Sequence, residues 1–236
     1  MSTEARLAIV RQGVTFFEGR VNELSDAQLD EPSVLPDWSR RHVVAHVGYN
    51  ALAIARLVSW AETGVETPMY ESRAVRDAEI VSGAALSADA LRKLSMHAGM
   101  LLDSAWVNLP EEKWSAEVQT AQGRTVAASD TIWMRTREVW IHAVDLGVGA
   151  AFTDIPPPVL RRILEDIVAA WTTRGEHVGL QLEVTGGEGL LFGDRDAGDP
   201  LIVTGDLAAI TRWACGRPGA PVTSNRPGTP VAPRWL

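Results

Sequence analysis

The sequence predicts an α+β protein, with an antiparallel four-helix bundle in its N-terminal part and a small α+β domain at its C-terminal end. Two observations carry this prediction. Before residue 150, four segments place apolar side chains three and four positions apart, which is the spacing of helices that pack along one face. After Phe152, three consecutive prolines interrupt the chain, and short strand-like runs follow them. We therefore expect two domains, residues 1–152 and 153–236.

The four helical segments can be bounded from their residues. The first carries its apolar residues at Leu7, Val10, Val14, Phe17, Val21 and Leu24. Ser39 is a candidate N-cap for the second, which should run to about Thr63 and stop at Gly64. The third is marked by Leu91, Leu94, Ala98, Leu101 and Ala105 and is closed by Pro110. The fourth should extend from Ser129 to Gly147, since Asp130 favours a helix start and glycine a helix end.

The remaining segments are shorter. The connections at 64–86 and 110–128 are long for a bundle, and the second contains a candidate hairpin around Gln122 and Gly123. In the C-terminal part, the prolines at 156–158 favour the start of a helix. Strands are expected at 179–185, 190–192 and 201–204, and a last helix at 207–215.

Composition excludes several classes of function. The chain has 236 residues, of which 46% are hydrophobic and 22% charged, as in an ordinary globular protein. A net charge of −8 with scattered basic residues argues against nucleic-acid binding. No apolar run is long enough to cross a membrane, and the N-terminus has no secretory signal pattern. With a single cysteine, Cys215, we expect a cytoplasmic protein, which we further expect to be a monomer.

Glu138 and His142 are the most informative residues for function. They lie four positions apart in a predicted helix, so both side chains leave the same face. A carboxylate and an imidazole in this arrangement can bind one metal ion if a third ligand comes from elsewhere. His42 and His46 are both candidates, and we favour His46 because His42 lies in the exposed first turn of its helix.

Two histidines and one glutamate give a metal three protein ligands and leave one position open, as in catalytic rather than structural zinc sites. Zn²⁺ in this ligand set would keep a net charge of about +1, and iron, nickel or cobalt would also suit it. No second glutamate lies where a metalloprotease has its general base. Asp145, three residues after His142, is placed to support that histidine instead.

Several longer motifs resemble those of the mycothiol-dependent maleylpyruvate isomerase family. They are RRHVVAHVGYNA, WAETGVETPMY, TAQGRTV, WMRTREVWIHAVDLG and the terminal PRWL. The resemblance covers nearly the whole chain. It implies a DinB-like metal-binding bundle followed by a domain similar to sterol carrier proteins. It also implies that His46, Glu138 and His142 bind zinc, and that Arg217, in WACGRPG, is a catalytic residue. We expect Arg217 to bind a substrate carboxylate, although a role in capping the preceding helix is the alternative.

The same resemblance implies the reaction. Maleylpyruvate would be converted to fumarylpyruvate, a cis–trans isomerisation in the catabolism of gentisate-type aromatics. The thiolate of mycothiol would add to the double bond, allow it to rotate as a single bond, and then leave. Ligation to zinc would keep that thiol deprotonated. Cys215 lies outside the motifs with zinc ligands and is expected to fill space in the core.

Two other functions remain open at this point. A mycothiol-dependent zinc S-transferase acting on electrophiles would use the same three ligands but would need no residue that binds a diacid. A non-catalytic carrier of lipids or other small ligands is suggested only by the C-terminal domain, and it would leave the metal ligands without a role. Metal content separates the carrier from the enzymes, and an assay of maleylpyruvate with and without mycothiol separates the two enzymes.

Overall fold

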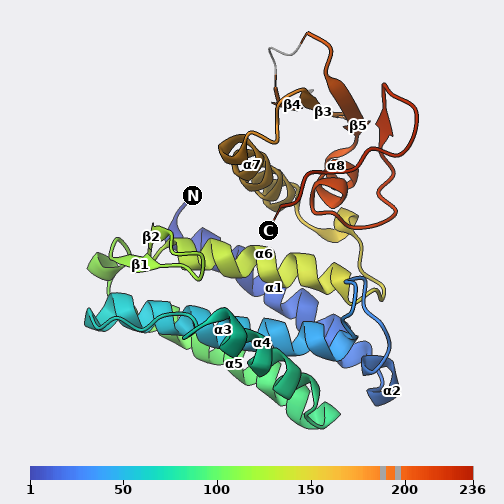
Figure 1. The fold of residues 1–236 in the computed structure, drawn as a ribbon. Coiled ribbons are helices and arrows are strands. Elements are labelled where there is room, and N and C mark those ends of the chain that lie inside the picture. Colours follow the sequence, from blue (N-terminus) through green and yellow to red (C-terminus); the bar gives the residue numbers. More distant parts are fainter. Residues whose placement is uncertain (187–189, 195–197, 236) are drawn as a thin grey trace. The chain divides into compact units, whose positions relative to one another are not determined.

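The computed structural model describes residues 1–186, 190–194 and 198–235, so Leu236 of the PRWL motif lies outside the described residues. The chain forms two compact units, Met1–Ala150 and Ala151–Leu236 (Figure 1). The division into functional domains 1–152 and 153–236 stays a prediction, because compactness alone does not define a domain's role. Among the described residues, no helix is both long and apolar enough to cross a membrane.

The first unit is built on four long helices, as the apolar spacing predicts. They are α1 (Thr3–Glu23), α3 (Arg40–Thr63), α5 (Ala88–Asn108) and α6 (Asp130–Asp145), with a short α2 (Asp26–Leu29) after α1. Ser39 is the N-cap of α3, and Gly64 ends this helix with a φ of 75°. A left-handed backbone conformation at that position strongly favours glycine, which explains why the end of α3 could be predicted from the sequence.

Two pairs of helices in this unit run antiparallel. Arg11 of α1 bonds to Asp103 near the end of α5, whereas Glu18, further along α1, accepts a hydrogen bond from Ser95, which precedes Asp103 on α5. The contacts between α3 and α6 follow the same reversed order. Helices α1 and α5, and helices α3 and α6, are therefore antiparallel pairs.

The neighbours α3 and α5 run parallel instead. Arg41, at the start of α3, donates to the carbonyl of Leu86 just before α5, and Gly48, one turn or more later, lies against Ser95. The chain must therefore return along the bundle between these two helices. This return explains why the connection after Thr63 is long.

The returning segment contains a helix that the sequence did not reveal. Residues 64–86 were expected to form a loop, but α4 (Arg73–Ala84) occupies half of them and packs on α3. Most residues of α4 are charged or small, and its buried residues are Ile80, Gly83 and Ala84, so only one large apolar side chain marks its inner face. Its tightest contact uses Gly83, where an added Cβ would lie 2.7 Å from the Tyr49 ring. The close contacts of Gly83 with Tyr49 and Ala45 of α3, together with the burial of Ile80, hold this helix.

The connection between α5 and α6 carries the hairpin that its glycine predicts. After a 3-10 turn, η1 (Glu111–Lys113), strand β1 (Glu117–Gln119) pairs antiparallel with β2 (Thr125–Ala127). Val118 and Val126 face each other across the pair, and Gly123 has a φ of 79° in the turn. The buried Val118 belongs to the same core cluster as Leu57 and Ile132, so the hairpin closes one end of the bundle core.

The second unit has helices and one small sheet, which confirms the predicted α+β class. Its elements are η2 (Phe152–Asp154), α7 (Pro157–Arg174), β3 (Leu180–Val184), β4 (Leu190–Gly193), β5 (Leu201–Gly205), α8 (Leu207–Ala214) and β6 (Thr223–Ser224). The strand order is β4-β3-β5-β6, with β3 and β5 parallel. Trp171 and Trp213 pack α7 on α8, with ring centroids 6.0 Å apart. Three strands were expected, and β6 is too short to give a sequence signal. The similarity to sterol carrier proteins stays a prediction.

Candidate metal centre

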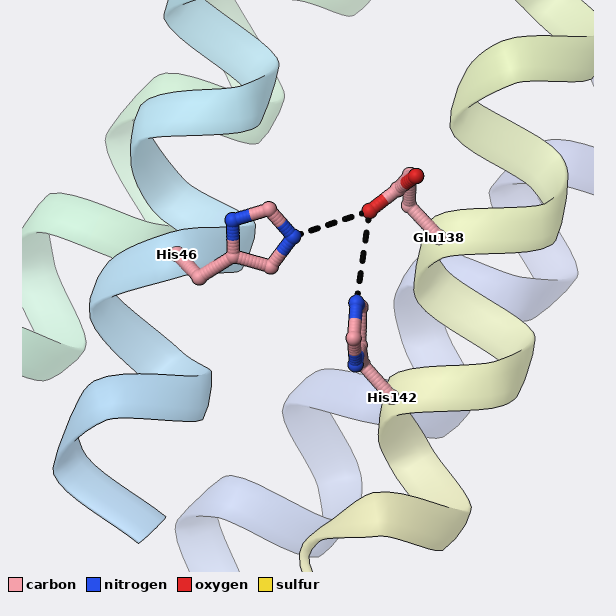
Figure 2. Close-up of side chains that lie close together, drawn as sticks. All are labelled: His46, Glu138 and His142. Atoms are coloured by element: carbon pink, nitrogen blue, oxygen red, sulfur yellow. Dashed lines mark hydrogen bonds and ion pairs between the residues drawn. The ribbon is translucent and has the colours of Figure 1, made fainter. Parts of the chain in front are cut away.

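Three side chains from α3 and α6 converge in the first unit (Figure 2). His46 lies in the second turn of α3 and is 6% exposed, while Glu138 and His142 are one turn apart on α6. Nε2 of His46 lies 3.0 Å from Oε2 of Glu138, and Nε2 of His142 lies 3.3 Å from the same oxygen. The sequence predicted that these three residues would meet, and in the fold they do.

The donor atoms have the chemistry and spacing of a zinc site. Ligand atoms about 2.0–2.1 Å from a tetrahedral Zn²⁺ lie about 3.4 Å from one another. One donor atom from each of the three residues lies within 4.8 Å of the others, and two of the separations are 3.0 and 3.3 Å. Small side-chain adjustments would therefore let two imidazole nitrogens and one carboxylate oxygen hold one ion.

His42, the other candidate for the third ligand, has a different role in the fold. Its Nδ1 lies 2.8 Å from the hydroxyl of Ser39 and 3.3 Å from the backbone nitrogen of the same residue. These contacts place His42 in the cap of α3. Of the two alternatives that the sequence left open, the structure brings His46, and not His42, to Glu138 and His142.

Asp145 contacts the ring nitrogen of His142 that is not directed at Glu138. The carboxylate of Asp145 is fully buried, and its Oδ2 lies 2.9 Å from Nδ1 of His142. When Nδ1–H donates a hydrogen bond to Asp145, the lone pair of Nε2 is left free for a cation. Together the carboxylates of Glu138 and Asp145 balance the charge of a divalent ion. The three ligands alone would leave a net charge of about +1, and counting Asp145 as well would bring the site to about zero.

Burial and mutual contacts shift the pKa values of this cluster. Burial would raise the pKa of Glu138, but hydrogen bonds from His142 and His46 outweigh burial and hold it well below its usual value. Burial would lower the pKa of His142, yet its bonds to Asp145 and Glu138 raise it to about 9. For His46, burial dominates and lowers the pKa. Without a metal, a proton on His142 thus supplies the positive charge that the buried carboxylates require.

We expect Asp145→Asn to weaken metal binding by at least about tenfold, in the range typical of groups that orient a ligand. The substitution keeps the size and one hydrogen-bond acceptor but removes the charge that supports His142. A competition titration with a chromophoric chelator measures the affinity. Asp103→Asn, on the exposed part of α5, is the matched control and should bind metal like the unaltered protein. Equal affinities for the two variants would contradict this role of Asp145.

The structure adds two residues that the sequence did not indicate. Nη2 of Arg76, on α4, lies 3.4 Å from Nδ1 of His46, and the Arg76 side chain is 31% exposed. The ring of Trp38 contacts His46 edge to face, with centroids 5.5 Å apart. Arg76 places a positive charge beside the cluster, and Trp38 covers one of its histidines. Arg76 could not have been found without the helix that carries it.

Arg217, the remaining predicted site residue, lies in the second unit just after α8. Its Nη1 donates to the carbonyl of Cys215 at 2.7 Å, which is the capping contact considered as the alternative. This bond does not prevent a role in catalysis, because a guanidinium has further donors. The catalytic role of Arg217 stays a prediction. Cys215 itself is 5% exposed, as expected for a residue that fills space in the core.

The family model for the mycothiol maleylpyruvate isomerase N-terminal domain matches residues 10–147. The model for the C-terminal domain of the same family matches residues 154–235. This chain belongs to the mycothiol maleylpyruvate isomerase family. The resemblance in the sequence motifs is thereby confirmed over both units.

Solved structures of this family agree with that assignment. A crystal structure of a mycothiol-dependent maleylpyruvate isomerase is 45% identical, with a TM-score of 0.95, and the match covers 100% of this chain and 98% of that one. A mutant of such an isomerase matches at 44% identity with the same TM-score and coverage. Among curated proteins, none gives a significant match.

A more distant structure bears on the bundle alone. YfiT from Bacillus subtilis is described as a probable metal-dependent hydrolase with an unusual four-helix bundle topology. It is 14% identical, and its TM-score is 0.50 over 62% of this chain and 88% of that one. Identity this low informs only the fold. The match confirms a bundle of this kind in the N-terminal part, and the parallel neighbours α3 and α5 depart from the usual up-and-down order.

Proposed function

We propose that the chain converts maleylpyruvate to fumarylpyruvate with mycothiol as its thiol cofactor, as a step in the catabolism of gentisate-type aromatics. The observation that carries the proposal is the 45% identity, over the full chain, to a mycothiol-dependent maleylpyruvate isomerase. The cluster of His46, Glu138 and His142 supports it, because this cluster can hold a metal ion that would lower the pKa of a bound thiol.

Zinc and mycothiol, when bound, would supply a thiolate near neutral pH, and its reversible addition to the double bond allows rotation about that bond. The protein's own residues would hold the metal ion and orient its ligands. Asp145 fixes the orientation of the His142 ring and keeps its Nε2 directed at the cluster. Burial of His46 and Glu138 limits the access of water, which would otherwise compete for the open position.

Positive charge is needed beside this site, because maleylpyruvate carries two carboxylates and the chain has a net charge of −8. Glu138 and Asp145 together would neutralise a divalent ion, and Arg137, 3.9 Å from Glu138, adds a positive charge at the edge of the centre. Arg76 lies next to His46 and is exposed enough to meet a substrate; its Nη1 pairs with Asp77 at 2.9 Å, and a guanidinium has further donors. We propose that Arg76 binds one carboxylate, while Arg217 is the candidate for the other.

Metal content and an isomerase assay test the proposal. The purified chain should contain about one zinc per molecule and should isomerise maleylpyruvate only when mycothiol is added. The mycothiol concentration should stay constant during turnover, because the thiolate is released in each cycle. Stoichiometric consumption of mycothiol with an electrophile, without isomerisation, would assign the S-transferase function instead. If the purified protein contains no metal and has neither activity, the carrier function is the one supported.

We expect Cys215→Ser to retain the isomerase activity to within about twofold, because a buried thiol in the core has no access to substrate. The measurement compares kcat/KM of this variant and of the unaltered protein at saturating mycothiol. A control without mycothiol should be inactive for both proteins. If the unaltered protein still isomerises maleylpyruvate after all small thiols are removed, and Cys215→Ser loses this activity, Cys215 is the nucleophile. That pair of results would refute the thiol requirement.

A further inference from the structure

A groove of about 410 Å³ lies between α1 and α5, away from the three candidate metal ligands. The ion pair of Arg11 with Asp103 and the hydrogen bond from Ser95 to Glu18 join the two helices on either side of this groove. Between these points lies Gly99, where an added Cβ would meet only one Val14 carbon, at 3.9 Å. The groove is open because this position of α5 has no side chain to fill it.

The walls of the groove are apolar and partly exposed. Met96 and Met100 of α5 are 45% and 64% exposed, and Val107 of the same helix is 62% exposed. Val10 and Val14 form the facing wall on α1. Exposed apolar side chains gathered around a concavity are typical of a ligand groove, and flexible methionines adapt to the shape of a bound molecule.

Arg135 of α6 lines the same groove and is only 1% exposed. Its Nη1 donates to the carbonyl of Val47 at 2.6 Å and to Oδ1 of Asn50 at 3.1 Å. Its Nε has no hydrogen-bond partner. A buried donor without a partner is unfavourable by roughly 1–3 kcal/mol, so an acceptor from a ligand would be stabilised there.

Glu18 supplies the complementary acceptor. Its carboxylate accepts the hydrogen bond from Ser95 at 2.6 Å, and it lines the groove with Arg135. The ionised residues of the groove are Arg11, Asp103, Glu18 and Arg135, so their charges cancel. An ionic ligand would lose its hydration without finding net opposite charge, whereas a neutral ligand avoids this cost.

We propose that this groove binds a neutral apolar molecule that carries a hydroxyl group, such as a phenol. A hydroxyl accepts one hydrogen bond and donates another, so it can satisfy both Arg135 and Glu18. The apolar body occupies the space opposite Gly99, against the methionines. None of the three candidate metal ligands lines the groove, and the inference does not depend on the isomerase reaction.

The test compares three probes with one apolar body: 4-propylphenol, 4-propylbenzoate and 4-propylbenzylamine. Binding to the full chain is measured by calorimetry and by NMR of ¹³C-labelled methionine methyl groups. We expect saturable binding of the phenol, shifts at Met96 and Met100, and affinities at least about tenfold weaker for the two ionic probes. Tightest binding of the benzoate or the amine would overturn the claim for a neutral ligand.

Gly99→Leu should abolish binding, because the new side chain fills the groove while leucine favours the helix. Gly19→Leu is the matched control: Gly19 also lies in a helix, has open space around it and does not line the groove. The control should bind the phenol like the unaltered chain. Equal binding by both variants, or no binding of the phenol by the unaltered chain, would refute the proposal. If the unaltered chain self-associates but does not bind the phenol, and Gly99→Leu abolishes the self-association, the groove binds a second copy of the chain. That result would also refute the proposal.

Discussion

Replacing His46 with alanine is expected to remove the metal from the purified protein and to abolish the isomerase activity. His46 is the only one of the three candidate ligands that α3 contributes, and Glu138 and His142 alone would leave an ion with two protein ligands. We expect metal content below about a tenth of that of the unaltered protein, and a loss of activity of at least about a hundredfold. Elemental analysis and the maleylpyruvate assay measure the two effects.

His42→Ala is the control for this experiment, since it removes an imidazole from the same helix, one turn earlier. His42 contacts Ser39 in the helix cap, so its loss should lower the free energy of unfolding by about 1 kcal/mol and leave the metal in place. Full zinc occupancy in His46→Ala, together with loss of zinc in His42→Ala, would show that the ligand is His42. Full occupancy in both variants would show that zinc binds elsewhere.

Arg217→Ala is expected to lower kcat/KM for maleylpyruvate by at least about tenfold, because a hydrogen bond to a charged group contributes about 1.5–3 kcal/mol. The metal content should not change, since the candidate ligands all belong to the first unit. A guanidinium suits this task because it remains charged at any working pH and binds a carboxylate through two donors. Steady-state kinetics and metal analysis on the same preparation measure the two quantities.

Arg76→Ala provides the comparison, because Arg76 is the other arginine proposed to bind a substrate carboxylate. If each arginine binds one carboxylate, both single variants should lose activity, and Arg217→Lys should recover part of the loss. If Arg217→Ala has an unchanged kcat/KM while Arg76→Ala is impaired, the contact between Arg217 and Cys215 is only a helix cap, and the clamp predicted for Arg217 is wrong.

The long helices and the pair on α6 could be predicted because their signals are local. Gly64 ends α3 where the sequence indicates, and Glu138 and His142 share a face of α6 because they lie four residues apart. The choice of His46 over His42 also followed from local reasoning, since a residue one turn deeper in a helix is more often buried. In each case neighbours within one or two turns decide the outcome.

The parts that could not be predicted depend on contacts between distant segments. Helix α4 packs on α3 through Gly83, and Ile80 is its one large apolar residue that is buried, which is too weak a signal to identify the helix from the sequence. Arg76 was missed for the same reason, because its position beside His46 exists only once α4 has packed. Strand β6 has two residues and pairs with β5 about twenty positions earlier, so nothing within the strand identifies it.

A metal ion at this site would link two distant parts of the chain. His46 and Glu138 are 92 residues apart in the sequence, yet their side chains meet across α3 and α6. An ion bound by both would close a loop that contains most of the first unit, much as a reversible cross-link would. Its binding free energy would then also be folding free energy for that loop. In a cell short of zinc, such a protein would lose part of its stability together with its activity, so metal supply would set how long it persists.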